Sequence, residues 1–241
     1  MSAVSAVTGI RLAVAAVLLL ALAGCTTTPA PITHEGSQSP SRNDQAAAAT
    51  GAEMPFTLAT VRQQLAAVPV KPVDPYADYN RTADFGEAWQ DVDHNGCDTR
   101  SDILRRDLTD VTLTGSCKVD TGTLHDPYTG TVVHYVRGPE SSESVQIDHV
   151  VPVYEAWRTG AQRWPQAQRV AFANDPLNLL ASAGAANQDK GDLDPSRWLP
   201  PLASYRCEYV ERYVTVVAKY GLWVTSREKP AISRVLGACP S

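Results

Sequence analysis

The stretch QIDHVVP, residues 146–152, places two side chains that can carry charge, Asp148 and His149, inside an apolar run. A histidine has an ordinary pKa of about 6.5, so it can take a proton from water near neutral pH. A neighbouring carboxylate can bind a hard cation such as Mg²⁺ through oxygen. By itself, such a pair is more typical of a core histidine hydrogen-bonded to backbone than of a catalytic site.

Further polar residues follow this pair at a spacing that changes its interpretation. Asn178 lies in NDPLNLL, and Asn187 and Lys190 lie in ANQDKGD. The chain between the two asparagines is about as long as a short strand or turn that leads into a helix. Pro152 cannot donate to a strand ladder, so we expect the first strand to end there. The pattern favours one site built from a strand end, a loop and a helix.

In this order the motifs resemble the HNH, or ββα-metal, nucleases. IDHVVP, AW, GA, NDPLNL, NQDKGD and WLPP resemble exported HNH-endonuclease-like proteins and the C-terminal nuclease part of GmrSD-type restriction enzymes. The resemblance runs from about Trp89 to Cys239. It implies an α+β fold, namely a His-Me finger (ββα-metal) nuclease core at about 143–195 with added helices and short strands.

The resemblance also implies a role for each site residue. His149 would be the general base, and Asp148 would bind Mg²⁺ or Mn²⁺ through its carboxylate. Asn187 would be the second metal ligand, through its amide oxygen. Asn178 would hold the loop and backbone around His149, as residues behind a site do. Lys190, one helical turn after Asn187, would contact phosphate.

The implied reaction is phosphodiester hydrolysis in nucleic acid, with DNA as the expected substrate and no inferred protein partner. Arg100 and Arg137 are candidate phosphate contacts, because guanidinium groups match phosphate geometry. Surface ion pairs are the alternative role for each arginine. The net charge of −5 argues against a protein that coats nucleic acid through charge alone.

Two other functions stay open at this point. A zinc enzyme acting on the cell wall predicts a motif such as HExxH, which the sequence lacks. A non-catalytic envelope lipoprotein could keep a nuclease-like scaffold and bind calcium. Within residues 91–102, Asp91, Asp93 and Asn95 have EF-hand spacing. Position 12 of an EF-hand loop is a bidentate Glu, but this sequence has Asp102 there. A structural turn is therefore the favoured interpretation of this loop.

The N-terminus predicts export. Arg11 precedes the apolar run LAVAAVLLLALAGC, which is shorter than the roughly 20 residues that a membrane span needs. Residues 22–25 resemble a lipobox, so we expect a lipoprotein signal peptide over 1–24 and a lipid on Cys25. An ordinary secretory signal is the alternative. Residues 25–54, rich in Thr, Pro, Ser and Ala, read as a flexible tether. The protein would then be anchored by lipid alone to the extracytoplasmic face of the cell membrane.

Residues 55–241 remain as one nuclease-like domain. Its four cysteines predict two disulfides in an exported protein. Three pairings are possible, and we favour Cys97–Cys117 and Cys207–Cys239 because each closes a local loop. A four-cysteine zinc site is the rival, although no CxxC spacing supports it.

Apolar periodicity predicts the elements of this domain. Helices are expected over 56–70, 99–108 and 205–221, with two short helices broken near Gly160 and Pro165. Extended segments are expected over 111–119, 130–138, 145–153 and 175–182.

Overall fold

The computed structural model of the protein describes residues 57–75, 78–139 and 142–240. The expected signal peptide (1–24), the lipidation site Cys25 and the tether (25–54) lie outside the described residues. Within the described ranges, no helix combines the length and the apolar character that crossing a bilayer requires.

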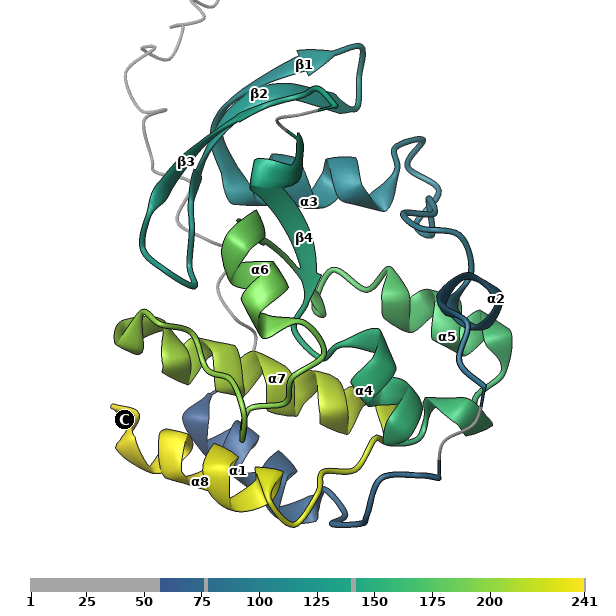
Figure 1. Cartoon of the computed structure of the whole chain (residues 1–241), viewed down its shortest axis with the longest axis vertical. Helices are drawn as coiled ribbons and strands as arrows, with labels where there is room; N and C mark the ends of the chain where they lie inside the picture. Colours follow the sequence, from purple (N-terminus) through teal and green to yellow (C-terminus); the bar gives the residue numbers. More distant parts are fainter. Residues whose placement is uncertain (1–56, 76–77, 140–141, 241) are drawn as a thin grey trace, which may run out of the picture. The chain divides into compact units, whose positions relative to one another are not determined.

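The first helix packs against the last two (Figure 1). They are α1 (Leu58–Ala67), α7 (Arg206–Tyr220) and α8 (Glu228–Ala238). Thr57 begins α1 by accepting a hydrogen bond from the backbone N–H of Thr60 at 3.2 Å. Gly221 ends α7 at a φ of 65°, which glycine adopts without strain. The Cys207–Cys239 disulfide, a pair predicted from sequence, joins the beginning of α7 to the residue after α8.

A three-stranded antiparallel sheet lies next to helix α3 (Figure 1). The elements in chain order are α2 (Arg81–Phe85), α3 (Thr99–Asp107), β1 (Leu108–Thr114), β2 (Lys118–His125) and β3 (Val132–Val136). The single strand expected over 111–119 is wrong. A turn at Gly115, with a φ of 66°, divides it into the end of β1 and the beginning of β2. The second predicted disulfide, Cys97–Cys117, ties this turn to the loop before α3.

A second sheet has two antiparallel strands, β4 (Val145–His149) and β5 (Leu179–Ala183). Helix α6 (Gly184–Lys190) follows β5 directly. A side chain at Gly184 would come 2.1 Å from the backbone oxygen of Glu143, so the strand-to-helix turn requires glycine here. The region therefore folds as strand, strand and helix within a mixed α+β structure.

The chain between β4 and β5 forms α4 (Val153–Arg158) and α5 (Gln166–Ala173). Their boundaries match the breaks expected near Gly160 and Pro165. Short 3₁₀ helices cover Ser142–Ser144, Ala161–Arg163 and Ala203–Tyr205.

Two apolar clusters meet at strand β4. The larger cluster joins the helices and includes Val150 and Val151, which follow the strand. The smaller cluster joins α3 to the sheets and includes Ile147 of β4 and Leu179 of β5. The end of β4 is therefore anchored on both sides by buried side chains, which fixes the backbone that carries Asp148 and His149.

Candidate functional site at the end of strand β4

Asp148 and His149 are the last two residues of β4, so their side chains leave the strand on opposite faces. Asp148 is 4% exposed. Its Oδ1 accepts a hydrogen bond from Lys190 Nζ at 2.9 Å, and its Oδ2 accepts one from Tyr128 Oη at 2.5 Å. Burial, followed by the negative charge of Asp148, raises the pKa of Tyr128 well above its usual value. The carboxylate is thus held between one cation and one hydroxyl.

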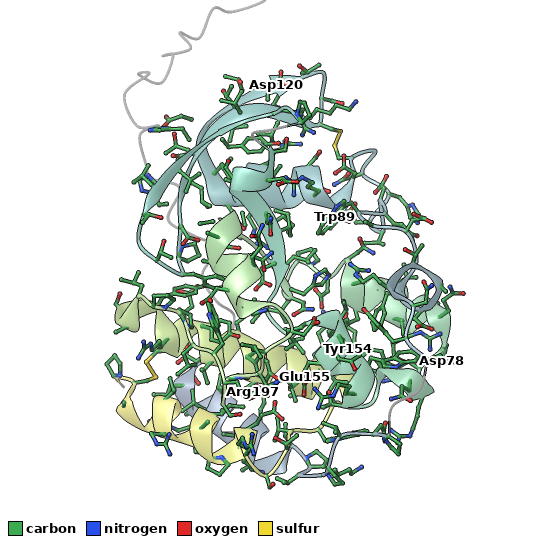
Figure 2. The ribbon with its side chains drawn as sticks, viewed as in Figure 1. Asp78, Trp89, Asp120, Tyr154, Glu155 and Arg197 are labelled. Carbon is green, nitrogen blue, oxygen red and sulfur yellow. A yellow bond between two sulfur atoms is a disulfide. The ribbon has the colours of Figure 1, made fainter. Side chains whose placement is uncertain are left out.

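The ring of His149 is held by two contacts. Its Nε2 lies 2.8 Å from the backbone oxygen of Ala173. A carbonyl can only accept, so Nε2 carries the proton and Nδ1 is left as an acceptor. The indole of Trp89, which is labelled in Figure 2, stacks on the imidazole with centroids 6.1 Å apart and planes inclined by 17°. Together these contacts fix both the tautomer and the orientation of the ring.

The imidazole of His149 is kept neutral by its surroundings. Burial, followed by the positive charge of Arg81, lowers the pKa of His149 to about 4. The hydrogen bond to Ala173 and the charge of Asp148 act in the opposite direction. The ring is therefore a neutral proton acceptor at pH 7.

Asn178 is fully buried and holds the loop that follows His149. Its Oδ1 accepts from the backbone N–H of Val151 at 2.8 Å, and its Nδ2 donates to the oxygen of Val151 at 3.2 Å. The backbone N–H of Val150 donates to the carbonyl of Asn178 at 2.8 Å. Three hydrogen bonds from one residue therefore set the path of the chain after the histidine, at the place that the sequence predicted.

Asn187 lies on α6 at the edge of a cavity of about 250 Å³. The cavity is also lined by Asp148, His149 and Asp192. Asn187 Nδ2 donates to Gln146 Oε1 at 2.8 Å, which leaves the amide oxygen of Asn187 as an available acceptor. The structure thus brings three of the predicted site residues to one cavity.

Lys190 is buried and does not line this cavity. Its side chain is 0% exposed, and its Nζ donates to Asp148 Oδ1 and, at 2.8 Å, to the backbone oxygen of His149. A phosphate could reach this ammonium only if the core opened, so the phosphate contact predicted for Lys190 does not fit. The lysine instead fixes α6 against the end of β4.

The two predicted phosphate arginines also bind elsewhere. Arg100 donates to the backbone oxygens of Ser142 and Val145, at 3.3 and 3.1 Å. Arg137 donates through Nε to the backbone oxygen of Val119 at 2.7 Å. Neither lines the cavity of His149, so their contacts indicate roles in holding backbone rather than phosphate.

Sequence reasoning missed three residues that act on the site. They are Trp89, Arg81 and Tyr128. Trp89 is partly exposed and has a φ of 62°, an uncommon conformation for a residue other than glycine. No local pattern marks these residues, because each meets Asp148 or His149 only after the chain has folded. The positive φ of Trp89 is likewise visible only in the structure.

The loop with EF-hand spacing is closed by its own hydrogen bonds. Asp91 accepts from the backbone N–H groups of Asn95 and Gly96, at 3.1 and 3.0 Å. The side chain of Asn95 donates to Asp93 and Asp102. Among the described residues, no group of three or more His, Cys, Asp or Glu side chains is placed to hold a metal ion.

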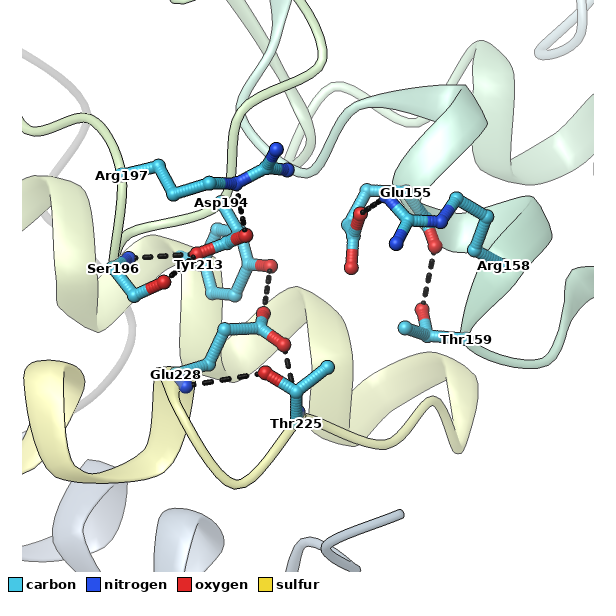
Figure 3. A network of polar contacts seen from close by, with 9 residues as sticks. All are labelled: Glu155, Arg158, Thr159, Asp194, Ser196, Arg197, Tyr213, Thr225 and Glu228. Carbon is cyan, nitrogen blue, oxygen red and sulfur yellow. Dashed lines mark hydrogen bonds and ion pairs between the residues drawn. The ribbon is translucent and has the colours of Figure 1, made fainter. Parts of the chain in front are cut away.

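Buried carboxylates of α4 and α8 belong to a network of polar contacts shown in Figure 3. Glu155 pairs with Arg158 at 3.2 Å, and Glu228 accepts from Tyr213 at 2.9 Å. Burial, followed by the charge of Glu228, raises the pKa of Glu155 to about 7. Burial also raises the pKa of Glu228. The network is therefore sensitive to pH close to neutrality.

Comparisons with known proteins place these features in context. A family model described as the C-terminal domain of GmrSD restriction endonucleases matches residues 98–235. A protein of Arthroderma benhamiae, described as an uncharacterized secreted protein, is 39% identical over 182 residues, which make up 75% of this chain and 85% of that protein. No solved structure matches the chain significantly.

Proposed function

Because the chain belongs to the family of GmrSD restriction endonuclease C-terminal domains, we propose that it is a metal-dependent endonuclease acting on nucleic acid, with DNA as the expected substrate. One observation carries this proposal: His149 Nε2 donates to Ala173, which leaves Nδ1 as a proton acceptor at the edge of a cavity. A neutral imidazole with a free, oriented acceptor can serve as a general base, and its pKa of about 4 makes it a weaker base than one that titrates near the operating pH.

The elements β4, β5 and α6 would form the His-Me finger (ββα-metal) core, at about 143–195 of a domain over 55–241. The strand-strand-helix order and the antiparallel pairing of β4 with β5 support this assignment. His149 at the strand end and Asn187 on the helix then correspond to the base and to a ligand position.

In the proposed reaction, His149 Nδ1 takes a proton from water while the water oxygen bonds to phosphorus. The phosphorus–oxygen bond opposite to the attacking oxygen breaks, and the leaving oxygen takes a proton from solvent. The imidazolium that forms still donates Nε2–H to the fixed carbonyl of Ala173. Asn178 keeps the following loop in place, so the base does not have to reorganise during the reaction.

Asp148 and Asn187 would hold Mg²⁺ or Mn²⁺, and their oxygen donors fit such ions in kind. A carboxylate has roughly four acceptor positions, of which Lys190 and Tyr128 use two. A bound ion would stabilise negative charge at phosphorus and on the leaving oxygen. Since Lys190 already balances the charge of Asp148, we expect weak ion binding until the substrate phosphate adds negative charge.

We also propose that the protein works outside the cytoplasm. Its two disulfides are typical of exported proteins, and the relative from Arthroderma benhamiae is described as secreted. Attachment to the membrane through a lipid on Cys25 is part of the proposal and follows from the sequence alone.

Supercoiled plasmid incubated with the purified full-length protein tests the proposal. We expect relaxed and linear products with Mg²⁺ or Mn²⁺, and none after addition of EDTA. Absence of cleavage in either metal, with both DNA and RNA as substrates, would overturn it. The non-catalytic envelope lipoprotein would then be the remaining interpretation.

A further inference from the structure

A second cavity, of about 500 Å³, is lined by residues that adjoin in sequence the two residues holding the ring of His149. Each residue that contacts the ring is followed in sequence by a residue that lines the cavity. Trp89, which stacks on His149, is followed by Gln90, and Ala173, which binds Nε2, is followed by Asn174. Gln90 and Asn174 both line the cavity. The cavity wall therefore begins one residue along the chain from each of the two contacts that hold the ring.

The walls of the cavity suit a flat, partly apolar group. Val170 and Ala171 of α5 line it together with Val92, which is 38% exposed and lies on the loop before α3. The flat face of a base could cover these apolar side chains. The volume lies within the range of ordinary small-ligand sites.

The polar atoms of the cavity argue against a phosphate and for a neutral group. Asp175 Oδ2 accepts from Lys219 Nζ at 2.6 Å and from Tyr220 Oη at 2.9 Å, so the lysine is already paired. Asp91 adds a second carboxylate to the lining. The side-chain oxygen of Asn174 has no hydrogen-bond partner among the described residues, although the residue is only 1% exposed. An amino group on a base is a donor that would suit such an acceptor.

We propose that this cavity binds the base of an unpaired nucleotide next to the scissile phosphate. The inference rests on the proposed nuclease function and narrows its substrate to single-stranded or locally opened nucleic acid. A base that is paired and stacked in a duplex cannot enter a pocket unless it is first flipped out, which costs free energy. An unpaired base enters without that cost.

Binding without cleavage separates this inference from the proposed function. The full-length protein with His149→Ala is mixed, in EDTA, with a fluorescent 12-nucleotide single strand or with the same strand in a duplex, and anisotropy gives the two affinities. The cavity is filled by Ala171→Trp, a substitution at an exposed helical position. The matched control is Ala59→Trp, at an exposed position of α1.

We expect the single strand to bind at least tenfold more tightly than the duplex. Ala171→Trp should remove that difference, and Ala59→Trp should keep it. Equal or tighter binding of the duplex would overturn the inference, as would equal affinities for Ala171→Trp and Ala59→Trp. A protein that cleaves plasmid but shows either result keeps its nuclease function and loses the base cavity. A protein that never cleaves but loses single-strand binding with Ala171→Trp keeps the cavity and loses the nuclease function.

Discussion

Lys190 Nζ and Asp148 Oδ1 lie 2.9 Å apart in the protein interior, where the lysine side chain is 0% exposed and the aspartate side chain 5%. The pair spans 42 residues of sequence and joins α6 to the end of strand β4, just before the loop that follows His149. Removing either charge would leave the other buried and unpaired, which is far more costly than losing an ion pair in water. The pair therefore stabilises the packing of α6 on β4 and also fixes the carboxylate of Asp148 at the candidate site.

Replacing Lys190 with Met should lower the free energy of unfolding by about 3–5 kcal/mol, because Asp148 then keeps a buried charge without its cation. Urea denaturation followed by circular dichroism measures the change. Lys219→Met is the control, since Lys219 also pairs with an aspartate at 2.6 Å but its side chain is 50% exposed. The control should lose less than Lys190→Met, because Lys219 is half exposed and Tyr220 still donates to its aspartate, Asp175, which is 7% exposed. Equal losses for the two variants would contradict the buried pairing.

Replacing Asn178 with Ala should destabilise the protein and slow cleavage together. The backbone N–H and carbonyl of Val151 would lose their partners in the interior, at a cost of about 1–3 kcal/mol for each unpaired group. Urea midpoints and kcat report the two effects. Asn187→Ala, at a partly exposed position, should leave the urea midpoint nearly unchanged. An Asn178→Ala protein with the wild-type midpoint would argue against this role.

Asn187 can be tested as a metal ligand without reference to activity. Asn187→Asp keeps an oxygen donor at the cavity and adds a negative charge, whereas Asn187→Ala removes the donor. Titration with Mn²⁺ in the presence of an oligonucleotide, followed by electron paramagnetic resonance, should show binding by the aspartate variant at least as tight as in the wild type. The alanine variant should bind at least tenfold more weakly. Identical titrations for both variants would remove Asn187 from the ligand set.

Glu155 should make the protein less stable as the pH rises from 4.5 to 7. Its pKa is raised from 4.5 to about 7 in the folded state. The contribution of Glu155 to the free energy of unfolding is therefore complete below pH 4.5, and it is lost as the carboxyl of the folded protein ionises. A shift of this size corresponds to roughly 3 kcal/mol. Relative to the wild type, Glu155→Gln should therefore gain stability between pH 5 and pH 8.

Urea denaturation at the two pH values measures this gain, with the exposed Glu87→Gln as the control. The control should differ from the wild type by the same amount at both pH values. A Glu155→Gln protein that behaves like the control would show that Glu155 ionises in the folded state as it does in water.

Sequence patterns predicted those parts of the fold that depend on local periodicity. The helix expected over 99–108 is observed as Thr99–Asp107, whereas the strand expected to end at Pro152 ends three residues earlier, at His149. The hairpin at Gly115 was missed because β-branched residues continue on both sides of the turn, so the run reads as one strand. Turn residues distinguish a hairpin from a single long strand, and the Gly-Ser pair at 115–116 is a weaker hairpin signal than Asn-Gly or Asp-Gly.

The residues of the site could be predicted only where their order and spacing along the sequence indicated a shared site. Asp148, His149, Asn178 and Asn187 stand at a recurring spacing, and the structure brings them close to one cavity or its supporting loop. The contact of Lys190 with Asp148 depends on how α6 packs on β4, which one-dimensional spacing does not determine. Trp89 stacks on His149 and the charge of Arg81 lowers the pKa of His149, from about 60 and about 70 residues earlier in the chain. Nothing in the neighbours of either residue indicates the interaction.

The central claim is that His149 takes a proton from water during phosphodiester hydrolysis. Plasmid cleavage in Mg²⁺ by His149→Ala tests it most directly, with His134→Ala as the control because His134 is exposed on β3, away from the cavity. Loss of a general base typically costs a factor of about 10²–10⁴. We expect a loss of that size for His149→Ala, partial recovery with added imidazole, and wild-type rates for His134→Ala. Cleavage by His149→Ala at the wild-type rate would contradict the claim.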